Sequence, residues 1–321
     1  MGIRDTAQSV KPRWRRVLGF GLAVLFLAAA VWSVANSVEA MGRLRAGLGG
    51  APAWVLVLLL VLPISNWLLT GALFHALTRP RVAVSPGHMT AIVGAAWLLN
   101  FFPLSPGFFG RLAYQKAALN LPVRTSVRIV LESLAAGWMV FLFALMATHE
   151  VTHGWGRFIW AGAWMVALLT ALFPMSRRQP AGLPSAYALA FVLKSVDFAL
   201  WALRYLVLLI LLGHEGEPTH AVALALVAQT AVLVPFIGNG LGVREWLVGL
   251  VAAAVPTWFI FASPTPHPSP IASGVALDLV GRAAEVVVAI PIGLACAAYL
   301  ANRTRTAGSG HAARSDAAGG S

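Results

Sequence analysis

The sequence has little charge for its length. Charged residues make up 11% of the 321 residues and hydrophobic residues 59%, whereas an average soluble domain has about 25% charged and about 45 to 50% apolar residues. A soluble fold of this size would need more polar surface than this composition supplies. The composition therefore excludes an ordinary soluble domain and indicates an all-α polytopic membrane protein.

Several signatures of chemistry are also missing. The single cysteine, Cys296, excludes an internal disulfide bond and a cysteine metal cluster. There is no phosphate-binding loop, dinucleotide fingerprint or nucleophile elbow, so we expect no cofactor. The net charge of +12 would favour nucleic acid in a soluble protein, but no soluble domain is expected to carry a binding face. We therefore expect no nucleic-acid partner.

Long apolar runs are abundant. A transmembrane helix needs about 20 largely apolar residues. Besides eight runs that meet this length, a ninth apolar run, residues 88–109, is interrupted by prolines and glycines and leads into a basic stretch. The sequence thus predicts about eight transmembrane helices plus one re-entrant or broken segment, arranged as two related halves. The eight predicted spans cover residues 17–36, 52–77, 129–148, 157–175, 186–212, 219–236, 246–262 and 271–300.

The basic residues predict the orientation in the membrane. If residues 88–109 re-enter, nearly all Lys and Arg outside the spans fall on one side, which the positive-inside rule places in the cytoplasm. If residues 88–109 cross, four basic residues move to the outer face, namely Arg111, Lys116, Arg124 and Arg128. Re-entry is therefore favoured. We expect a multi-pass protein of the cell (inner) membrane with both termini in the cytoplasm.

The same arrangement divides the chain into three regions. Residues 1–16 form a basic cytoplasmic amino tail, and residues 17–301 form the membrane domain. Residues 302–321 are rich in Gly, Ala, Ser and Arg without apolar periodicity, so we expect a disordered carboxyl tail.

Two apolar runs are broken in a similar way, at residues 103–111 and 235–245. Each contains Pro and Gly and is closed by an arginine, Arg111 or Arg244. Broken helices at corresponding points of two halves free backbone groups to meet a polar ligand within the membrane. Ordinary loops also contain Pro and Gly, but the repetition favours a ligand site, and the arginines favour an anionic headgroup.

Ionisable residues inside the predicted spans are a second signal. Such groups are costly in lipid and usually face a cavity or a partner. Within the sets that have several members, spacings of three or four residues place the charged side chains on one helix face. Such groups can have a functional role, or they can form ion pairs whose only role is to join helices. The sets are Glu132; Lys194, Asp197 and Arg204; and Asp278, Arg282 and Glu285.

Four stretches resemble the flippase-like transmembrane domain of lysylphosphatidylglycerol synthases and its stand-alone relatives. They are Asn100-Phe-Phe-Pro103 through Lys116, Glu132, Pro235 through Glu245, and Leu279-Val-Gly-Arg282. The similarity covers most of residues 10–300 and implies movement of lipid between leaflets. For Arg282 it implies a functional role, as a partner of Glu245 or as a phosphate ligand. The synthases carry a soluble aminoacyl-transferase domain after the membrane part, which this sequence lacks, so we expect a stand-alone member without aminoacyl transfer.

The sequence therefore predicts a protein, not an enzyme, that binds and translocates an amphipathic lipid, anionic or phosphate-bearing, between leaflets. Arginine and lysine side chains would hold phosphate, and carboxylates would orient them or carry a proton. The predicted site residues are Pro103, Gly107, Arg111, Lys116, Glu132, Pro235, Asn239, Gly240, Gly242, Arg244, Glu245, Asp278 and Arg282.

Two other functions remain open. His149-Glu150-Val151-Thr152-His153 fits the zinc motif H-E-x-x-H, in which two histidines one turn apart bind the metal and the glutamate activates a water molecule. This motif predicts a membrane-embedded metallopeptidase. An accessory subunit of a lipid-modifying or glycan-assembling enzyme would instead form a stable complex with a protein partner and transport nothing alone.

Overall fold

The computed structural model describes residues 28, 32, 38–102, 106–151, 183–213, 218–232, 242–254 and 270–318. Within these residues all regular elements are α-helices, which confirms the all-α prediction. The helices are α2 (Val38–Gly50), α3 (Ala53–Thr78), α4 (Pro86–Leu99), α5 (Pro106–Leu119), α6 (Val123–Val151), α8 (Leu183–Leu211), α9 (Pro218–Val232), α10 (Val243–Ala254) and α11 (Pro270–Ala318).

Four of the described helices are long and apolar enough to cross a membrane. They are α3, α6 over Val123–Ala144, α8 over Pro184–Leu211 and α11 over Ile271–Arg303. The count of about eight is not reached in the described residues, because α9 has 15 residues and α10 has 12, which is shorter than the roughly 20 residues a span needs. The predicted spans 17–36 and 157–175 lie almost entirely outside the described residues.

The predicted ninth run is broken into two short helices. Helices α4 and α5 have 14 residues each, so each is about 21 Å long at 1.5 Å per residue, against a hydrocarbon core of about 30 Å. They are antiparallel, because the Tyr114 hydroxyl near the end of α5 lies 3.2 Å from Nε2 of His88 at the start of α4. The run 88–109 therefore belongs to a helical hairpin, in which α4 ends at Leu99 and α5 begins at Pro106.

Among the described helices, one order of lengths occurs twice. The long α3 is followed by the short α4 and α5 and the long α6, and the long α8 by the short α9 and α10 and the long α11. The contacts follow the same order, since α3 packs on α4 as α8 packs on α9, and α4 packs on α5 as α9 packs on α10.

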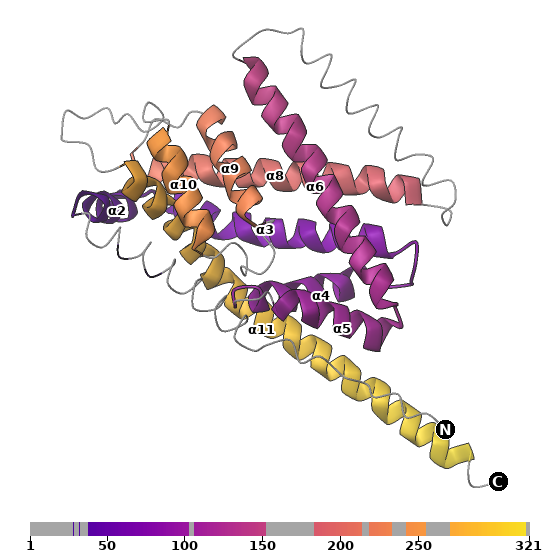
Figure 1. Ribbon diagram of the computed structural model, residues 1–321. Helices are drawn as coiled ribbons and strands as arrows, with labels where there is room; N and C mark the ends of the chain where they lie inside the picture. Colours follow the sequence, from indigo (N-terminus) through magenta and orange to yellow (C-terminus); the bar gives the residue numbers. More distant parts are fainter. Residues whose placement is uncertain are drawn as a thin grey trace, which may run out of the picture.

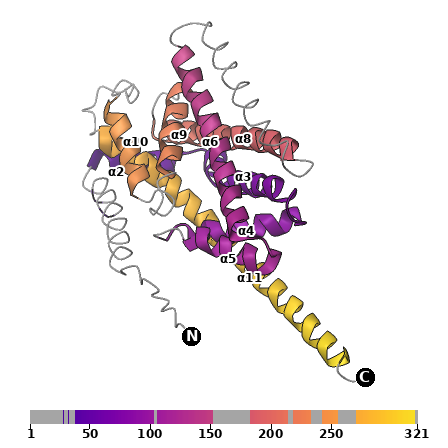
Figure 2. The ribbon, with the colours of Figure 1, turned by 45° about the vertical axis from the view of Figure 1, so that its right-hand side comes forward.

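Helices α3 and α8 pack side by side at the centre of the molecule. Helices α4 and α5 lie on the side of α3 away from α8, and α6 crosses α3 and α8 steeply (Figure 1). Helix α11 passes along α10 and α4 and then projects beyond the other helices, as the turned view also shows (Figure 2). The core between α3 and α8 is aliphatic, with Leu59, Leu208 and Leu209 almost completely buried.

The outward faces of the long helices are apolar. Exposed large side chains include Val57 and Leu68 on α3, Leu131 on α6, Val192 on α8 and Val287 on α11. By contrast, seven charged side chains within α8, α10 and α11 are buried: Asp197, Arg204, Arg244, Glu245, Asp278, Arg282 and Glu285. Apolar side chains outside and charges inside are the reverse of a soluble protein, and this arrangement suits an integral membrane protein.

Helix α11 differs from the prediction at its end. It continues to Ala318, past residue 302, where the sequence predicts a disordered tail. The segment contains several alanines and arginines, which are among the strongest helix formers, so the helix can extend without apolar periodicity. The predicted amino tail, residues 1–16, lies outside the described residues.

Candidate functional site

A glycine and an asparagine hold the start of α5 against the end of α4. A Cβ atom on Gly107 would lie 2.0 Å from the Ala96 carbonyl oxygen, so only glycine lets α5 begin this close to α4. Asn100 follows α4, and its Oδ1 accepts a hydrogen bond of 3.1 Å from the Phe108 backbone N–H at the start of α5. These two contacts hold the first turn of α5 against the end of α4 and thereby position Arg111 one turn further on.

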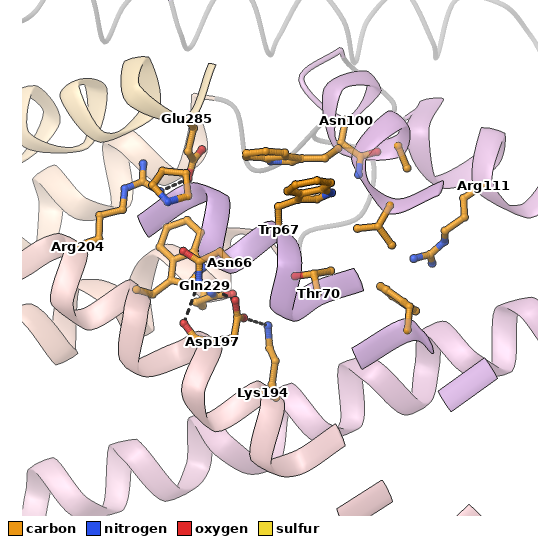
Figure 3. A pocket seen from close by; sticks show the side chains of 16 residues that line it. Asn66, Trp67, Thr70, Asn100, Arg111, Lys194, Asp197, Arg204, Gln229 and Glu285 are labelled. Carbon is orange, nitrogen blue, oxygen red and sulfur yellow. Dashed lines mark hydrogen bonds and ion pairs between the residues drawn. The ribbon is translucent and has the colours of Figure 1, made fainter. Parts of the chain in front are cut away.

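A cavity of about 240 Å³ lies beside this turn, between α3, α4, α5, α8, α9 and α11. Figure 3 shows Arg111 entering from one side, Arg204 and Glu285 from the opposite side, and Lys194 and Asp197 from α8. The lining combines apolar residues with many polar ones: Pro63, Asn66, Trp67, Thr70, Phe74, Val93, Ala96, Trp97, Asn100, Arg111, Lys194, Asp197, Trp201, Arg204, Gln229 and Glu285.

Arg111 is the lining cation without a carboxylate partner among the described residues. Its guanidinium carbon lies 3.9 Å from the centre of the Phe74 ring, a cation–π contact. Its Nε atom is buried and has no hydrogen-bond acceptor. An arginine inside a membrane protein costs several kcal/mol unless an anion, a polar group or water compensates it, so the cavity favours an anion at this position.

The wall formed by α8 contains an ion pair whose two members satisfy each other. Lys194 Nζ lies 2.7 Å from Asp197 Oδ2, as the three-residue spacing predicts. Asp197 Oδ1 accepts a hydrogen bond of 2.7 Å from Nδ2 of Asn66 on α3. The pair therefore also joins α8 to α3, while the other amide atom, Asn66 Oδ1, is buried without a partner.

A network of buried charges lies next to the cavity. Arg244 donates from Nε to Asp278 Oδ2 over 2.8 Å and also pairs with Glu285, at 3.3 Å. Glu285 in turn pairs with Arg204, and Asp278 accepts a hydrogen bond from the Tyr205 hydroxyl. These contacts connect α8, α10 and α11 through groups that are almost completely buried.

Arg282 extends the same network. Its Nε donates to Glu245 Oε1 over 3.1 Å, which is the pairing that the resemblance implies, and its Nη1 lies 3.8 Å from Glu285 Oε2. Among the described residues, three arginines and three carboxylates thus share this region: Arg204, Arg244, Arg282, Glu245, Asp278 and Glu285. The charges are balanced inside the protein.

Glu132 belongs to a separate cluster. It pairs with Arg81 at 2.6 Å and with Arg128 at 3.0 Å, and it accepts a hydrogen bond of 2.8 Å from the Tyr187 hydroxyl. This cluster joins α6 to the end of α3 and the start of α8. Lys116 is exposed on α5 and does not line the cavity.

The structure therefore divides the predicted site into parts. Arg111 lines the cavity, and Gly107 lies at the nearby start of α5. Arg244, Glu245, Asp278 and Arg282 lie in the buried network. Gly242 (φ 81°) precedes α10 in the left-handed conformation that favours glycine. Pro103, Pro235, Asn239 and Gly240 lie outside the described residues.

Sequence reasoning missed some lining residues. Asn66 and the tryptophans Trp67, Trp97 and Trp201 line the cavity, yet none is ionisable, so the rule that marks charges in spans could not find them. A polar amide in the middle of an apolar run was the available signal for Asn66. Arg204, Lys194, Asp197 and Glu285 were found as buried charges but not as neighbours of Arg111.

The zinc motif is only partly within the described chain. Helix α6 includes His149 and Glu150, whose side chains are not described, and His153 lies beyond it. Where side chains are described, no three His, Cys, Asp or Glu residues come together in a way that could hold a metal ion.

Comparisons with family profiles, curated proteins and solved structures find no match to this chain. The family expected from the Pro-Gly stretches therefore stays a prediction.

Proposed function

We propose that this protein binds the headgroup of an amphipathic lipid in the cavity at Arg111 and moves the lipid between the two leaflets of a cell membrane. The observation that carries the proposal is a cationic side chain without a carboxylate partner, facing a polar cavity among apolar helices. An anionic lipid headgroup would supply the negatively charged partner of Arg111, and the acyl chains of the lipid match the apolar outer faces of the helices.

The short helices support an alternating mechanism. In the proposal, α4–α5 and α9–α10 are corresponding re-entrant hairpins of two related halves, since each pair lies between two long helices. In transporters of this design, the ligand binds near the membrane midplane where the broken helices meet, and one half rocks against the other. The cavity lies at the turn of the first hairpin, as this mechanism requires.

The roles of the arginines follow from their contacts. Arg244 and Arg282 donate to carboxylates of α10 and α11, so in this conformation they hold those helices together and leave the anion to Arg111. Glu285 lies in both the network and the cavity wall. We assign it the coupling of headgroup binding to movement of α11. The resemblance to flippase-like domains adds an independent reason to expect lipid movement.

The proposal predicts a specific loss on removal of the Arg111 charge. In liposomes, Arg111→Gln should slow the movement of an anionic fluorescent lipid about tenfold to hundredfold, because a charge-assisted hydrogen bond contributes about 1.5–3 kcal/mol. The measurement is the rate at which fluorescent lipids of the inner leaflet become accessible to a quencher outside the liposomes.

Arg124→Gln is the matched control. Arg124 is exposed on α6 and is absent from the cavity lining, so this variant loses the same charge and should move lipid at the wild-type rate. Equal rates for Arg111→Gln and wild type would contradict the assignment of the cavity, and equal slowing by both variants would indicate an effect of net charge alone.

A further inference from the structure

His88 joins the first turn of α4 to two other helices. Its Nδ1 atom lies 2.6 Å from Nη1 of Arg303 on α11, and its Nε2 atom lies 3.2 Å from the Tyr114 hydroxyl on α5. His88 is 7% exposed and lines a surface depression of about 690 Å³ together with Arg303 and Tyr114. None of these three residues lines the cavity at Arg111, so this is a separate site.

We propose that His88 is a pH-sensitive latch. In its neutral form the imidazole ties the carboxyl-terminal part of α11 to the α4–α5 hairpin, and protonation of the ring releases that part of α11. The proposal concerns the movement of helices and does not depend on which molecule occupies the cavity at Arg111.

The contacts of His88 require a neutral imidazole. A guanidinium has only N–H donors, so Nδ1 of His88 accepts the hydrogen bond from Arg303 and carries no proton. The single ring proton of the neutral form then lies on Nε2, which donates to the Tyr114 oxygen. A second proton, on Nδ1, would direct an N–H group at the N–H groups of the guanidinium and bring two positive charges together. The protonated ring therefore cannot keep the contact with Arg303.

Among the described residues, no carboxylate in contact with His88 offsets this repulsion. Besides Arg303, the groups that face the ring are Tyr114 of α5 and Tyr299 of α11, whose ring centres lie 5.7 Å and 6.3 Å away. The Ser85 hydroxyl accepts only from the backbone N–H of His88. Burial, and to a smaller extent the Arg303 charge, accordingly lower the pKa of His88 from its ordinary value of 6.5. The latched state thus binds the proton less readily than a released, hydrated ring, and it loses stability as the pH falls.

Pro291 gives α11 a place to bend when the latch opens. The start of α4 contacts Arg303, whereas the end of α4 packs at Gly293, where an added Cβ atom would collide with Leu98. The two helices are therefore antiparallel over this stretch of α11, which begins directly after Pro291. A proline inside a helix removes one backbone hydrogen bond and is a common site of bending. The part of α11 beyond Pro291 can thus swing away from α4 while the buried network before it stays paired.

Spin labels on the two sides of the latch measure its state. Ala113→Cys on α5 and Ala301→Cys on α11 place labels at exposed positions, in the full chain with Cys296→Ala. The measurement is the distribution of distances between the labels, by double electron–electron resonance, between about pH 8 and pH 5, where histidine titrates. We expect a single distance at about pH 8. A longer distance should appear below about pH 6.5, with the ratio of released to latched protein rising by up to about tenfold per pH unit.

Two variants assign the response to this contact. His88→Asn keeps an oxygen that can accept from Arg303 but does not titrate in this range, so we expect the latched distance at every pH. Arg303→Gln removes the charge that opposes protonation, and its amide can donate to the neutral ring or accept from the protonated one, so the distances should no longer depend on pH. Arg124→Gln is the matched control, because it loses the same charge at an exposed position of α6 and should keep the wild-type response.

A wild-type distance that stays unchanged down to about pH 5 would overturn the proposal. A pH response that persists in His88→Asn would also overturn it, because the titrating group would then lie elsewhere. If His88→Asn does not fold, the two arginine variants decide: loss of the response in Arg303→Gln alone supports the latch, and an equal response in Arg303→Gln and Arg124→Gln contradicts it. Lipid movement does not enter the measurement, so either result leaves the proposed function to its own test.

Discussion

Arg111 and Arg244 each follow a Pro-Gly break, but their surroundings differ. Arg111 contacts a phenylalanine ring beside the cavity, whereas Arg244 is completely buried between Asp278 and Glu285. From the sequence the two arginines look equivalent. Their difference comes from carboxylates on another helix, 34 or more residues away, and spacing within one segment carries no information about such partners.

Pairs within one helix were more predictable. The spacing of Lys194 and Asp197 and that of Arg282 and Glu285 place each pair on one face, and both ion pairs are present. The spacing did not show that Arg282 pairs with Glu245 of α10, which came from the resemblance. Neither the spacing of charged residues nor the resemblance indicated Arg81 as the partner of Glu132.

The buried network predicts a large effect of a small substitution. Asp278→Asn keeps the shape of the side chain but removes the charge that compensates Arg244, and breaking a buried pair costs about 3–5 kcal/mol. The measurement is the free energy of unfolding in detergent. Arg128→Gln breaks a pair in which the Arg128 side chain is 50% exposed, so it should cost less than about 1 kcal/mol. Similar decreases in the free energy of unfolding for Asp278→Asn and Arg128→Gln would contradict the stabilising role of the buried network.

Helix ends were predictable where proline or charge marks them. The run 52–77 became Ala53–Thr78, which begins after Pro52 and ends before Arg79 and Pro80. The predicted run 219–236 corresponds to α9, which is described from Pro218 to Val232, and residues 233–236 lie outside the described residues. Composition identifies apolar segments but does not show whether a segment crosses or turns back.

The hairpin α4–α5 predicts a strict requirement for glycine at its turn. Gly107→Ala places a methyl group 2.0 Å from the Ala96 carbonyl oxygen, so α5 must move away from α4, at a cost of about 1–3 kcal/mol. Gly87→Ala is the control in α4, since its Cβ would meet nothing within 4 Å. It should leave the thermal unfolding midpoint unchanged or raise it. A Gly107→Ala protein as stable as Gly87→Ala would show that the close approach is not required.

At the scale of the whole molecule, the cavity is made by helices far apart in the sequence. Asn66, Arg111, Asp197 and Glu285 meet because α3 packs on α8 and α11 packs on α4. The sequence predicted a membrane protein with paired breaks, and the described helices agree with its all-helical, apolar character. Which helices pack together depends on the fit of side-chain surfaces, so a pattern read along one segment could not predict it.

The hairpin also predicts the topology of the molecule. Ala83 and Ala117 line the same surface depression, at the start of α4 and the end of α5, whereas Trp54 lies at the opposite end of α3. In a Cys296→Ala background, Ala83→Cys and Ala117→Cys should react with an impermeant maleimide from the cytoplasmic side, and Trp54→Cys from the outside. Labelling of positions 83 and 117 from opposite sides would mean that the segment crosses the membrane.

The central claim is that this chain moves lipid. The most direct measurement is the rate at which fluorescent phosphatidylglycerol in the inner leaflet of liposomes becomes accessible to an external quencher, at increasing ratios of folded wild-type protein to lipid. The account predicts a rate above that of empty liposomes, increasing in proportion to the amount of protein. A rate equal to that of empty liposomes at every ratio, with protein that remains folded, would contradict it.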